Sequence, residues 1–171
     1  MIRGYITNLG RYNEGQLVGK WIDFPITTDE LEDVFNEIGI DEVYEEYFFT
    51  DWETDWELDI SKEFGEYPNI FEVSDITEEL EAIEDYGNLD WLYAYIECSG
   101  VSLSDAVNEF EDNSIFYGRD AYEVVEQFLS ECFGIEDRAV TSILNYMNYD
   151  DFANYELNLY QSDYGYIDCF W

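Results

Sequence analysis

The sequence predicts an α+β fold, and three observations carry this prediction. Both ends of the chain alternate polar and apolar residues as strands do, and the segments between them repeat apolar residues at helical spacing. The chain has 171 residues, of which 47% are hydrophobic and 19% aromatic. These side chains can form packed cores beneath an acidic surface, and the length permits one domain or a string of two or three small ones.

The beginning of the chain predicts a β-hairpin. Tyr5, Ile6 and Leu9 belong to an alternating run, residues 12–15 have the composition of a turn, and residues 17–24 form a second run. Two such runs separated by a short turn-forming segment are typical of antiparallel strands.

A short helix is predicted after the hairpin. Thr27 and Glu30 have the spacing of a capping box, and Gly39 is placed to end the helix. Between them apolar residues recur every three or four positions, as expected for one buried face: Leu31, Val34, Phe35 and Ile38.

Residues 44–60 change to a period of two, which predicts an extended segment with one acidic and one mostly apolar face. Residues two apart on a strand lie about 6.6 Å from each other, whereas phosphates recur about every 3.4 Å of axis along one DNA strand. One such row would therefore supply about half of that charge density. The acidic positions are Asp51, Glu53, Asp55, Glu57 and Asp59.

A calcium-binding loop is the main alternative for residues 51–62, since acids fall at the odd positions of an EF-hand pattern. The pattern requires glycine at its sixth position and glutamate at its twelfth, where this chain has Trp56 and Lys62. The sequence therefore predicts no calcium site here.

The middle of the chain is predicted to be helical. Gly65, Pro68 and Asn69 indicate a boundary, after which Ser74 or Asp75 is expected to cap a helix that runs to about Asp85. One of its faces is apolar and the other acidic, without the Lys or Arg that surface helices normally intersperse; the acids are Glu78, Glu81 and Asp85, with Glu79 and Glu84 beside them. Two further helical segments are expected at residues 89–98 and 103–110.

The last third continues this pattern and then becomes aromatic. A helix is predicted with an apolar face that includes Cys132 and an outer stripe of Asp120, Glu123, Gln127 and Glu131. A final hairpin is expected to turn at residues 163–165. Aromatic residues crowd the segment between them, and such side chains are enriched both in cores and at subunit interfaces.

The charge of the chain is one-sided. The sequence holds 42 acidic and 6 basic residues, a formal net charge of -36, and between Lys20 and Arg119 the only base is Lys62, against thirty acids. Such a protein repels nucleic acid and anionic membranes and attracts what binds them. No segment has the length of a membrane span and the start lacks the apolar core of a signal peptide, so a cytoplasmic location is expected.

Several classes of chemistry are disfavoured. The chain has no histidine, which removes the commonest general base and metal ligand, so we expect neither an enzyme nor a protein with a metal or cofactor. Cys98, Cys132 and Cys169 lack metal-site spacing and are expected to be buried free thiols.

Two functional classes remain. The first is an interaction protein whose carboxylates stand in for phosphates in the basic groove of a DNA-binding protein, where affinity would fall steeply as salt rises. A general inhibitor of basic DNA-binding proteins belongs to this class. The second is an acidic protein adapted to high salt and without mimicry. The abundance of large apolar residues and the acidic stripes on successive elements favour the first class.

The opening YITNLGRYNEGQLVGKWIDFP (residues 5–25), residues 102–129 and YMNYDDFANYEL (residues 146–157) resemble segments of the ArdA antirestriction proteins. The resemblance implies a protein of plasmids or conjugative transposons that mimics bent B-form DNA and occupies the DNA-binding groove of type I restriction-modification enzymes. It also implies an elongated chain of three small domains, near residues 1–61, 62–103 and 104–171, that forms a homodimer through the last. The middle domain is then mainly helical, and the outer two combine a short antiparallel sheet with helix.

Under this hypothesis the site is a surface of carboxylates that binds no nucleic acid directly. The expected phosphate-mimicking residues are Asp51, Glu53, Asp55, Glu57, Asp59, Glu78, Glu79, Glu81, Glu84, Asp85, Glu109, Glu111, Asp112, Asp120, Glu123 and Glu126. The expected dimer contacts are Tyr146, Tyr149, Phe152, Tyr155 and Leu157.

Salt is expected to stabilise the fold, because mutual repulsion among exposed carboxylates opposes compaction. The Debye length falls from about 30 Å to about 8 Å between 10 mM and 150 mM ionic strength. Urea unfolding followed by tryptophan fluorescence should therefore give a higher midpoint at the higher ionic strength, with a folded protein in both. Unfolding in ordinary buffer would instead support salt adaptation, and a midpoint independent of salt would contradict both readings.

Overall fold

The computed structural model describes residues 1–110, 116–134 and 137–168. It confirms the α+β class, with two small three-stranded antiparallel sheets near the two ends of the chain and helices between them. The chain divides into two compact units, Met1–Ala82 and Ile83–Trp171. The division into three domains stays a prediction. In the part that the structure describes, no helix is long and apolar enough to cross a membrane.

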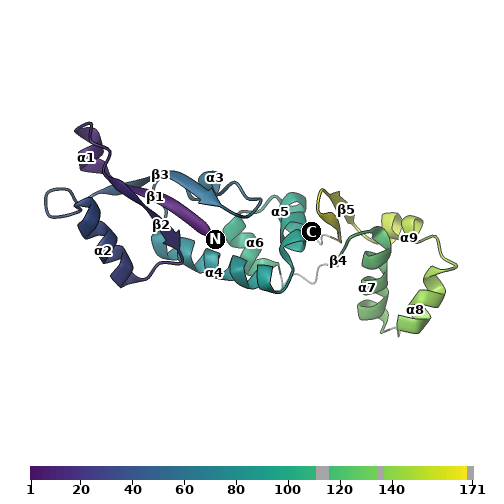
Figure 1. The fold of residues 1–171 in the computed structure, drawn as a ribbon. Coiled ribbons are helices and arrows are strands. Elements are labelled where there is room, and N and C mark those ends of the chain that lie inside the picture. Colours follow the sequence, from purple (N-terminus) through teal and green to yellow (C-terminus); the bar gives the residue numbers. More distant parts are fainter. Residues whose placement is uncertain (111–115, 135–136, 169–171) are drawn as a thin grey trace. The chain divides into compact units, whose positions relative to one another are not determined.

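The first unit is built on a sheet with the strand order β2-β1-β3, in which both neighbours of β1 run antiparallel to it (Figure 1). Its elements are β1 (Ile2–Asn8), α1 (Leu9–Asn13), β2 (Gly19–Phe24), α2 (Thr28–Ile38), β3 (Tyr47–Thr54), α3 (Ile60–Phe64) and α4 (Ile70–Asp85), the last of which runs past the division.

The predicted hairpin is confirmed as the pair β1 and β2, but its connection differs from the prediction. Leu9, expected in the strand, begins the short helix α1, whose N-cap is Asn8. Asn8 is fully buried, accepts a hydrogen bond from the Arg11 backbone N–H at 3.0 Å and donates to the carbonyl oxygens of Ile38 and Gly39 at 3.1 and 2.9 Å. One side chain therefore caps α1 and ties it to the end of α2.

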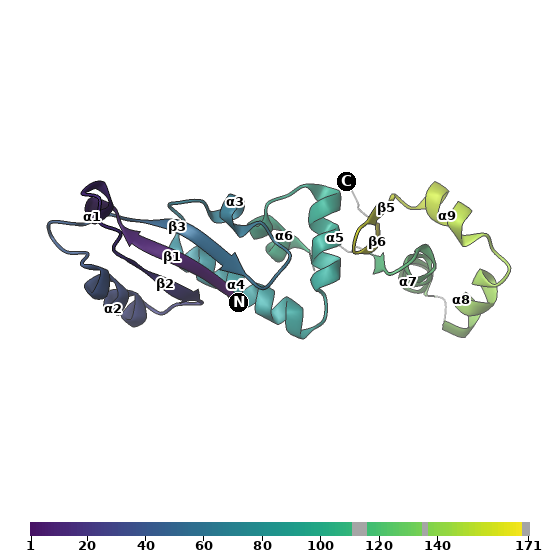
Figure 2. The same ribbon diagram turned by 45° about the horizontal axis from the view of Figure 1, so that its top comes forward.

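The two faces of this sheet are chemically different. Ile2, Ile6, Phe49 and Trp52 are buried and define an inner face. Helix α2 packs there, since the rings of Phe35 and Tyr47 lie 4.9 Å apart, and α4 lies on the same side of the sheet in Figures 1 and 2. Along each strand, the residues that alternate with these point to the opposite, outer face.

A bulge in β3 changes which residues reach each face. Tyr5 pairs with Asp51 and Ile6 with Phe49, which leaves Thr50 as an extra residue. Thr50 and Asp51 are consequently both exposed, although they are adjacent. Such an insertion shifts the alternation by one position.

The helix α2 confirms the prediction at both ends. Thr27 accepts from the backbone N–H of Glu30, the Glu30 carboxylate accepts from the backbone N–H of Thr27, and Gly39 adopts a left-handed φ of 72°. Two hydrogen bonds therefore satisfy N–H groups that the start of a helix leaves open.

The predicted start of α4 is too late by five or six residues. The helix begins at Ile70, where the Asn69 side chain accepts from the Phe71 backbone N–H at 3.2 Å. Ser74, which the prediction used as a cap, is buried inside the helix, donates to the carbonyl of Ile70 and accepts from the backbone N–H of Ile26. Its hydroxyl thus joins α4 to the segment before α2.

The second unit contains α5 (Leu89–Ser99), α6 (Leu103–Glu109), β4 (Tyr117–Gly118), α7 (Ala121–Phe133), α8 (Asp137–Leu144), α9 (Tyr149–Glu156), β5 (Leu159–Ser162) and β6 (Gly165–Asp168). Its sheet has the order β4-β6-β5. The helices α5, α6 and α7 and the final hairpin confirm predictions, whereas β4, α8 and α9 were not predicted. A core under α7 is formed by Phe116, Val124, Val125, Leu129, Leu144, Ala153 and Leu157.

Two predictions about α7 and the cysteines are wrong. Gln127, predicted on the outer stripe, donates to the backbone carbonyl of Tyr117 at 2.6 Å and accepts from its N–H at 3.3 Å, so it ties α7 to β4. Cys132 is free but exposed, and Cys98 forms a disulfide bond instead of remaining a free thiol. Cys169 lies outside the described residues.

Asp168 at the end of β6 is buried, and its carboxylate accepts a hydrogen bond from the Asn158 backbone N–H at 2.9 Å. Burial raises the pKa of Asp168 above its ordinary value, against the smaller opposing effect of that hydrogen bond. A carboxyl group whose pKa is higher in the folded state destabilises the fold increasingly as pH rises from its unfolded to its folded pKa.

Replacing this carboxylate with an amide should therefore stabilise the protein at neutral pH. Asp168→Asn keeps an oxygen that can accept from Asn158, and its midpoint of thermal unfolding should exceed that of the wild type at pH 7. The difference should disappear below about pH 4, where the unfolded carboxyl group is also protonated. Asp163→Asn, on the exposed turn of the same hairpin, controls for the loss of one negative charge. Equal shifts in the two variants at every pH would contradict the account.

Candidate protein-binding surface

Helix α4 carries the most regular series of carboxylates in the first unit. Its inner side is buried through Val73, Ile76 and Leu80. The other side exposes an uninterrupted acidic series with no basic residue in the helix: Glu72, Asp75, Glu78, Glu79 and Glu81, continued by Glu84 and Asp85 in the last turn. All of the α4 residues expected from the sequence are therefore exposed, and two acids of the series, Glu72 and Asp75, were missed because the helix was predicted to start too late.

The axial spacing of this series can be compared with that of phosphates. The nine steps from Glu72 to Glu81 advance about 13.5 Å at a rise of about 1.5 Å per residue. Five carboxylates over that distance are separated on average by about 3.4 Å along the helix axis, and phosphates recur about every 3.4 Å of axis on one DNA strand. A single helix thus reaches the axial charge density of one strand of duplex, although its carboxylates spread over more than one side of the helix.

The predicted row from Asp51 to Asp59 keeps its alternation but not its conformation. The acids at positions 51, 53, 55, 57 and 59 are all exposed and the residues between them are buried or half-buried. The strand, however, ends at Thr54, and Asp59 serves as the N-cap of α3 by accepting from the Lys62 backbone N–H. The prediction of an extended segment is therefore wrong beyond Thr54, where the alternation of exposed and buried residues continues although the strand has ended.

Basic groups partly neutralise this region. Arg3 lies between Asp23 and Glu53, its Nε 2.7 Å from the first carboxylate and its NH1 3.3 Å from the second. The register explains the arrangement, since Arg3 pairs with Asp23 on one side and with Glu53 on the other. The N-terminal amino group lies 3.8 Å from Asp55. Glu53 and Asp55 therefore offer less unbalanced charge than the α4 series.

The acids expected around α7 are a less uniform group. Asp120 is the N-cap of α7, and Arg119 binds Glu123 with a nitrogen-to-oxygen distance of 2.7 Å. The hydrogen bonds from Arg119 hold the pKa of Glu123 below its ordinary value. Glu126 is only half-exposed, whereas Glu109 is exposed and accepts from the Tyr95 hydroxyl at 3.4 Å. Glu111 and Asp112 lie outside the described residues.

Helix α2 is a second acidic helix that the sequence reading left out of the site. Its exposed acids include Asp29, Glu32 and Asp33, opposite the buried Leu31 and Val34. The same helical period that revealed the α4 stripe would have identified these residues. Glu37 at the last turn is bound to Lys20 of β2.

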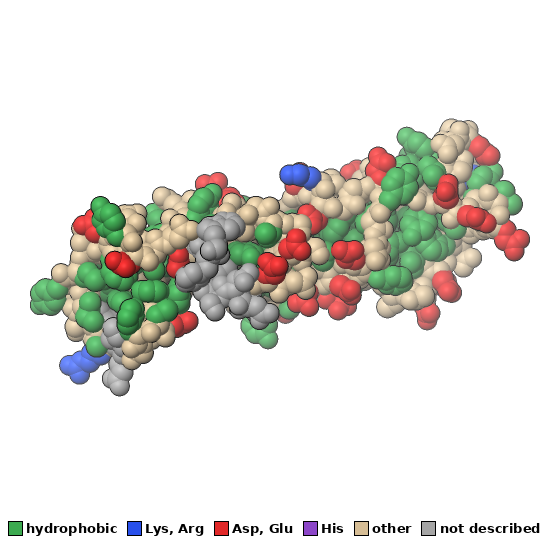
Figure 3. Space-filling model, turned by 180° about the vertical axis from the view of Figure 1, so that it is seen from behind, with side chains coloured by type: hydrophobic (Ala, Val, Ile, Leu, Met, Phe, Trp, Pro, Cys, Tyr) green, Lys and Arg blue, Asp and Glu red, His purple; other side chains and the backbone are tan. Residues whose placement is uncertain are grey.

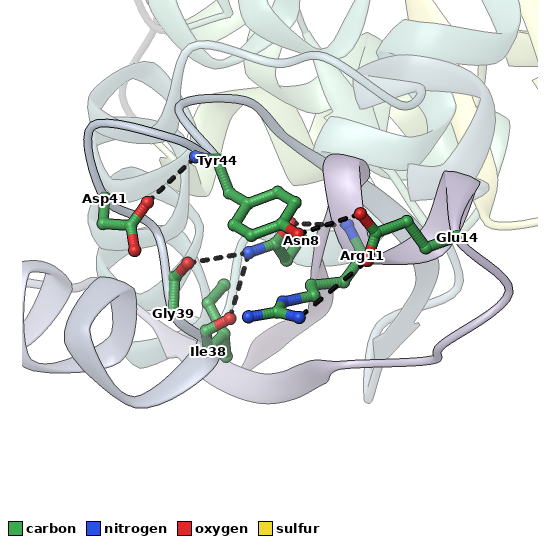
Figure 4. A network of polar contacts seen from close by, with 7 residues as sticks. All are labelled: Asn8, Arg11, Glu14, Ile38, Gly39, Asp41 and Tyr44. Atoms are coloured by element: carbon green, nitrogen blue, oxygen red, sulfur yellow. Dashed lines mark hydrogen bonds and ion pairs between the residues drawn. The ribbon is translucent and has the colours of Figure 1, made fainter.

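Residues 41–46 form an acidic loop that local contacts hold in place (Figure 4). Asp41 accepts from the backbone N–H groups of Val43 and Tyr44 at 2.8 and 2.9 Å, and these bonds lower its pKa. The Arg11 guanidinium lies 4.3 Å from the centre of the Tyr44 ring, whose hydroxyl donates to Glu14 at 2.9 Å. The loop exposes Glu42, Glu45 and Glu46, which the sequence reading also missed.

The aromatic residues expected at a dimer interface separate into two groups. Tyr146 and Tyr155 are 95% and 84% exposed. Tyr149 and Phe152 pack against the core under α7, and Leu157 belongs to that core.

Across residues 1–110, 116–134 and 137–168, no group of three or more His, Cys, Asp or Glu side chains is arranged to hold a metal ion. On the face drawn in Figure 3, many acidic side chains accompany isolated basic ones. Arg3, Arg11, Lys20 and Arg119 are each engaged with carboxylates. The geometry therefore defines an acidic protein whose candidate site is an extended anionic surface.

The comparison with protein families identifies the class of protein. The family model of the antirestriction protein ArdA matches residues 4–168, and the chain belongs to that family. Proteins of this family are inhibitors of restriction-modification enzymes and not enzymes themselves. No curated protein sequence matches the chain.

Proposed function

We propose that this protein blocks type I restriction-modification enzymes, in both cleavage and modification, by occupying their DNA-binding groove as a mimic of B-form DNA. Lys and Arg side chains that normally meet phosphates would meet carboxylates. Binding would release counterions from both surfaces, so affinity should decrease as salt increases. Phosphate contacts carry no base information, hence the sequence preference of the target enzyme should matter little.

The carboxylate series of α4 is the observation that supports this proposal most strongly. Its axial spacing is close to that of one DNA strand, no base interrupts it, and a buried opposite face fixes its orientation. Carboxylates on a packed helix have a fixed backbone before binding, so less backbone freedom is lost when the partner arrives. The acids of α2 and of residues 41–46 would extend the anionic surface.

The proposal includes a homodimer that forms through the C-terminal part of the chain. Tyr146 and Tyr155 support it, because large exposed rings are enriched at protein interfaces and these two are nearly fully exposed. A dimer would double the negative charge that one complex presents, from -36 for a single chain.

Neutralising the α4 series should weaken binding to a type I methyltransferase more than neutralising other acids. The variant Glu78→Gln, Glu79→Gln, Glu81→Gln changes three exposed carboxylates to amides of the same size, in residues that favour helix equally. Each exposed pair contributes about 0 to 1 kcal/mol, and about 1.4 kcal/mol is a factor of ten. We expect a loss of about tenfold or more in affinity at low salt, measured by titration calorimetry.

The matched control is Glu42→Gln, Glu45→Gln, Glu46→Gln, which also removes three negative charges from the initial -36 but leaves α4 intact. Equal losses in both variants would mean that the α4 series contributes no more than other acids of the anionic surface. Unchanged affinity of the α4 variant would exclude this helix as a phosphate mimic.

A further inference from the structure

The outer face of the sheet in the first unit carries an aromatic surface that has no role in the proposed mimicry of phosphates by carboxylates. Strand register places Tyr5 opposite Trp21 on one side and opposite Asp51 on the other, away from the buried inner face. The Tyr5 and Trp21 rings meet edge to face at 5.4 Å, and both are half-exposed. Because both rings are already partly exposed, they can contact a partner without a change in the fold.

The same face continues to a second aromatic group at the start of β3. Phe48 pairs with Thr7 in the register. Its ring lies 5.2 Å from that of Tyr12 in α1 and 6.2 Å from that of Tyr67 in the loop before α4. Phe48 itself is buried, whereas Tyr12 and Tyr67 are 49% and 66% exposed. Contacts with Phe48 therefore fix two exposed rings in position.

Arg3 joins this surface to its charged rim. Its guanidinium carbon lies 5.3 Å from the centre of the Trp21 ring, and it also binds the carboxylates of Asp23 and Glu53. Trp, Tyr and Arg are the residues most enriched among those that dominate binding energy, and such residues are typically surrounded by polar neighbours. The outer face combines these residue types within one sheet.

We propose that this outer face, comprising Tyr5, Tyr12, Trp21, Phe48 and Tyr67 with Arg3, supplies a salt-independent contact with the same restriction-modification enzyme. Its counterpart is an apolar patch beside the basic groove. The inference rests on the proposed function and adds a second contribution to the affinity for the enzyme, besides that of the carboxylates. Exposed ion pairs each contribute little, and tight complexes obtain most of their energy from a few desolvated aromatic anchors.

The charge around this face favours a basic enzyme as its partner over a second copy of this chain or single-stranded nucleic acid. Asp23, Asp51 and Glu53 border the rings, so a positively charged protein is attracted to the face. A second copy of this chain docked here would bring its own Asp23, Asp51 and Glu53 against the same carboxylates of this rim. Single-stranded nucleic acid stacks on aromatic rings but requires a positive groove, which the acidic rim does not offer.

The test compares the salt dependence of affinity for variants of the full chain and a type I methyltransferase. The variants are Tyr67→Ala, which shortens a mostly exposed ring, and Trp21→Thr, which retains a residue suited to strands. Each should weaken binding at least about fivefold, by the same factor at every salt concentration. Plots of log affinity against log salt should shift downward with unchanged slope, because the slope reports ionic contacts. Neutralising the α4 carboxylates should instead make the slope shallower.

Tyr86→Ala is the control, because Tyr86 is 79% exposed and lies outside the sheet; its affinity should stay within about twofold of wild type. Thermal unfolding establishes whether each variant is folded. If Trp21→Thr does not fold, the affinity of Tyr67→Ala alone tests the inference. The inference would be overturned if Tyr67→Ala bound the methyltransferase as tightly as the wild type, or if Tyr86→Ala lost as much affinity as Tyr67→Ala. The variants that neutralise carboxylates would still test the proposed function. Loss of self-association or of single-stranded DNA binding, with enzyme affinity unchanged, would assign the face to another occupant and also overturn it.

Discussion

Repulsion among carboxylates is the constraint on which the rest of this structure depends. A chain with 42 acidic and 6 basic residues can remain compact only if the acids stay in water and the burial of apolar surface outweighs their mutual repulsion. Aromatic packing provides much of that burial: Trp52 alone lies within 6 Å of the rings of Phe24, Phe49 and Phe64. Two bases join neighbouring elements: Arg3 binds carboxylates of β2 and β3, and Lys20 of β2 binds Glu37 of α2.

The same arrangement makes the acids useful for binding. A carboxylate on a disordered chain would lose its freedom when it met a basic partner, whereas the α4 carboxylates are positioned by a helix whose opposite side is buried. The outer sheet face follows the same logic, because its exposed rings rest on Phe48. Charge fixed in rows would attract and orient a basic enzyme, and fixed rings would contribute contact that salt does not screen.

The sequence predicted correctly those features of the fold that depend on residues close together in the chain. The caps of α2 and the turn of the final hairpin depend on neighbours in sequence, and both were correct. Ser74 was misread as a cap because its partner, Ile26, is distant in sequence, and the two-residue strand β4 exists only through its pairing with β6. Exposure of the acids at 51–59 was predictable from alternation, but the end of β3 at Thr54 was not. The pairing of Arg3 with two carboxylates required the sheet register.

Equilibrium competition between this protein and duplex DNA for a type I methyltransferase tests the central claim most directly. A labelled duplex bound to the methyltransferase is titrated with the protein at several salt concentrations, and bound duplex is measured by fluorescence anisotropy. The account predicts complete displacement, with an apparent affinity that falls in proportion to added DNA because the two ligands exclude each other. A saturated ternary complex that retains the duplex, or no displacement even at low salt, would contradict it.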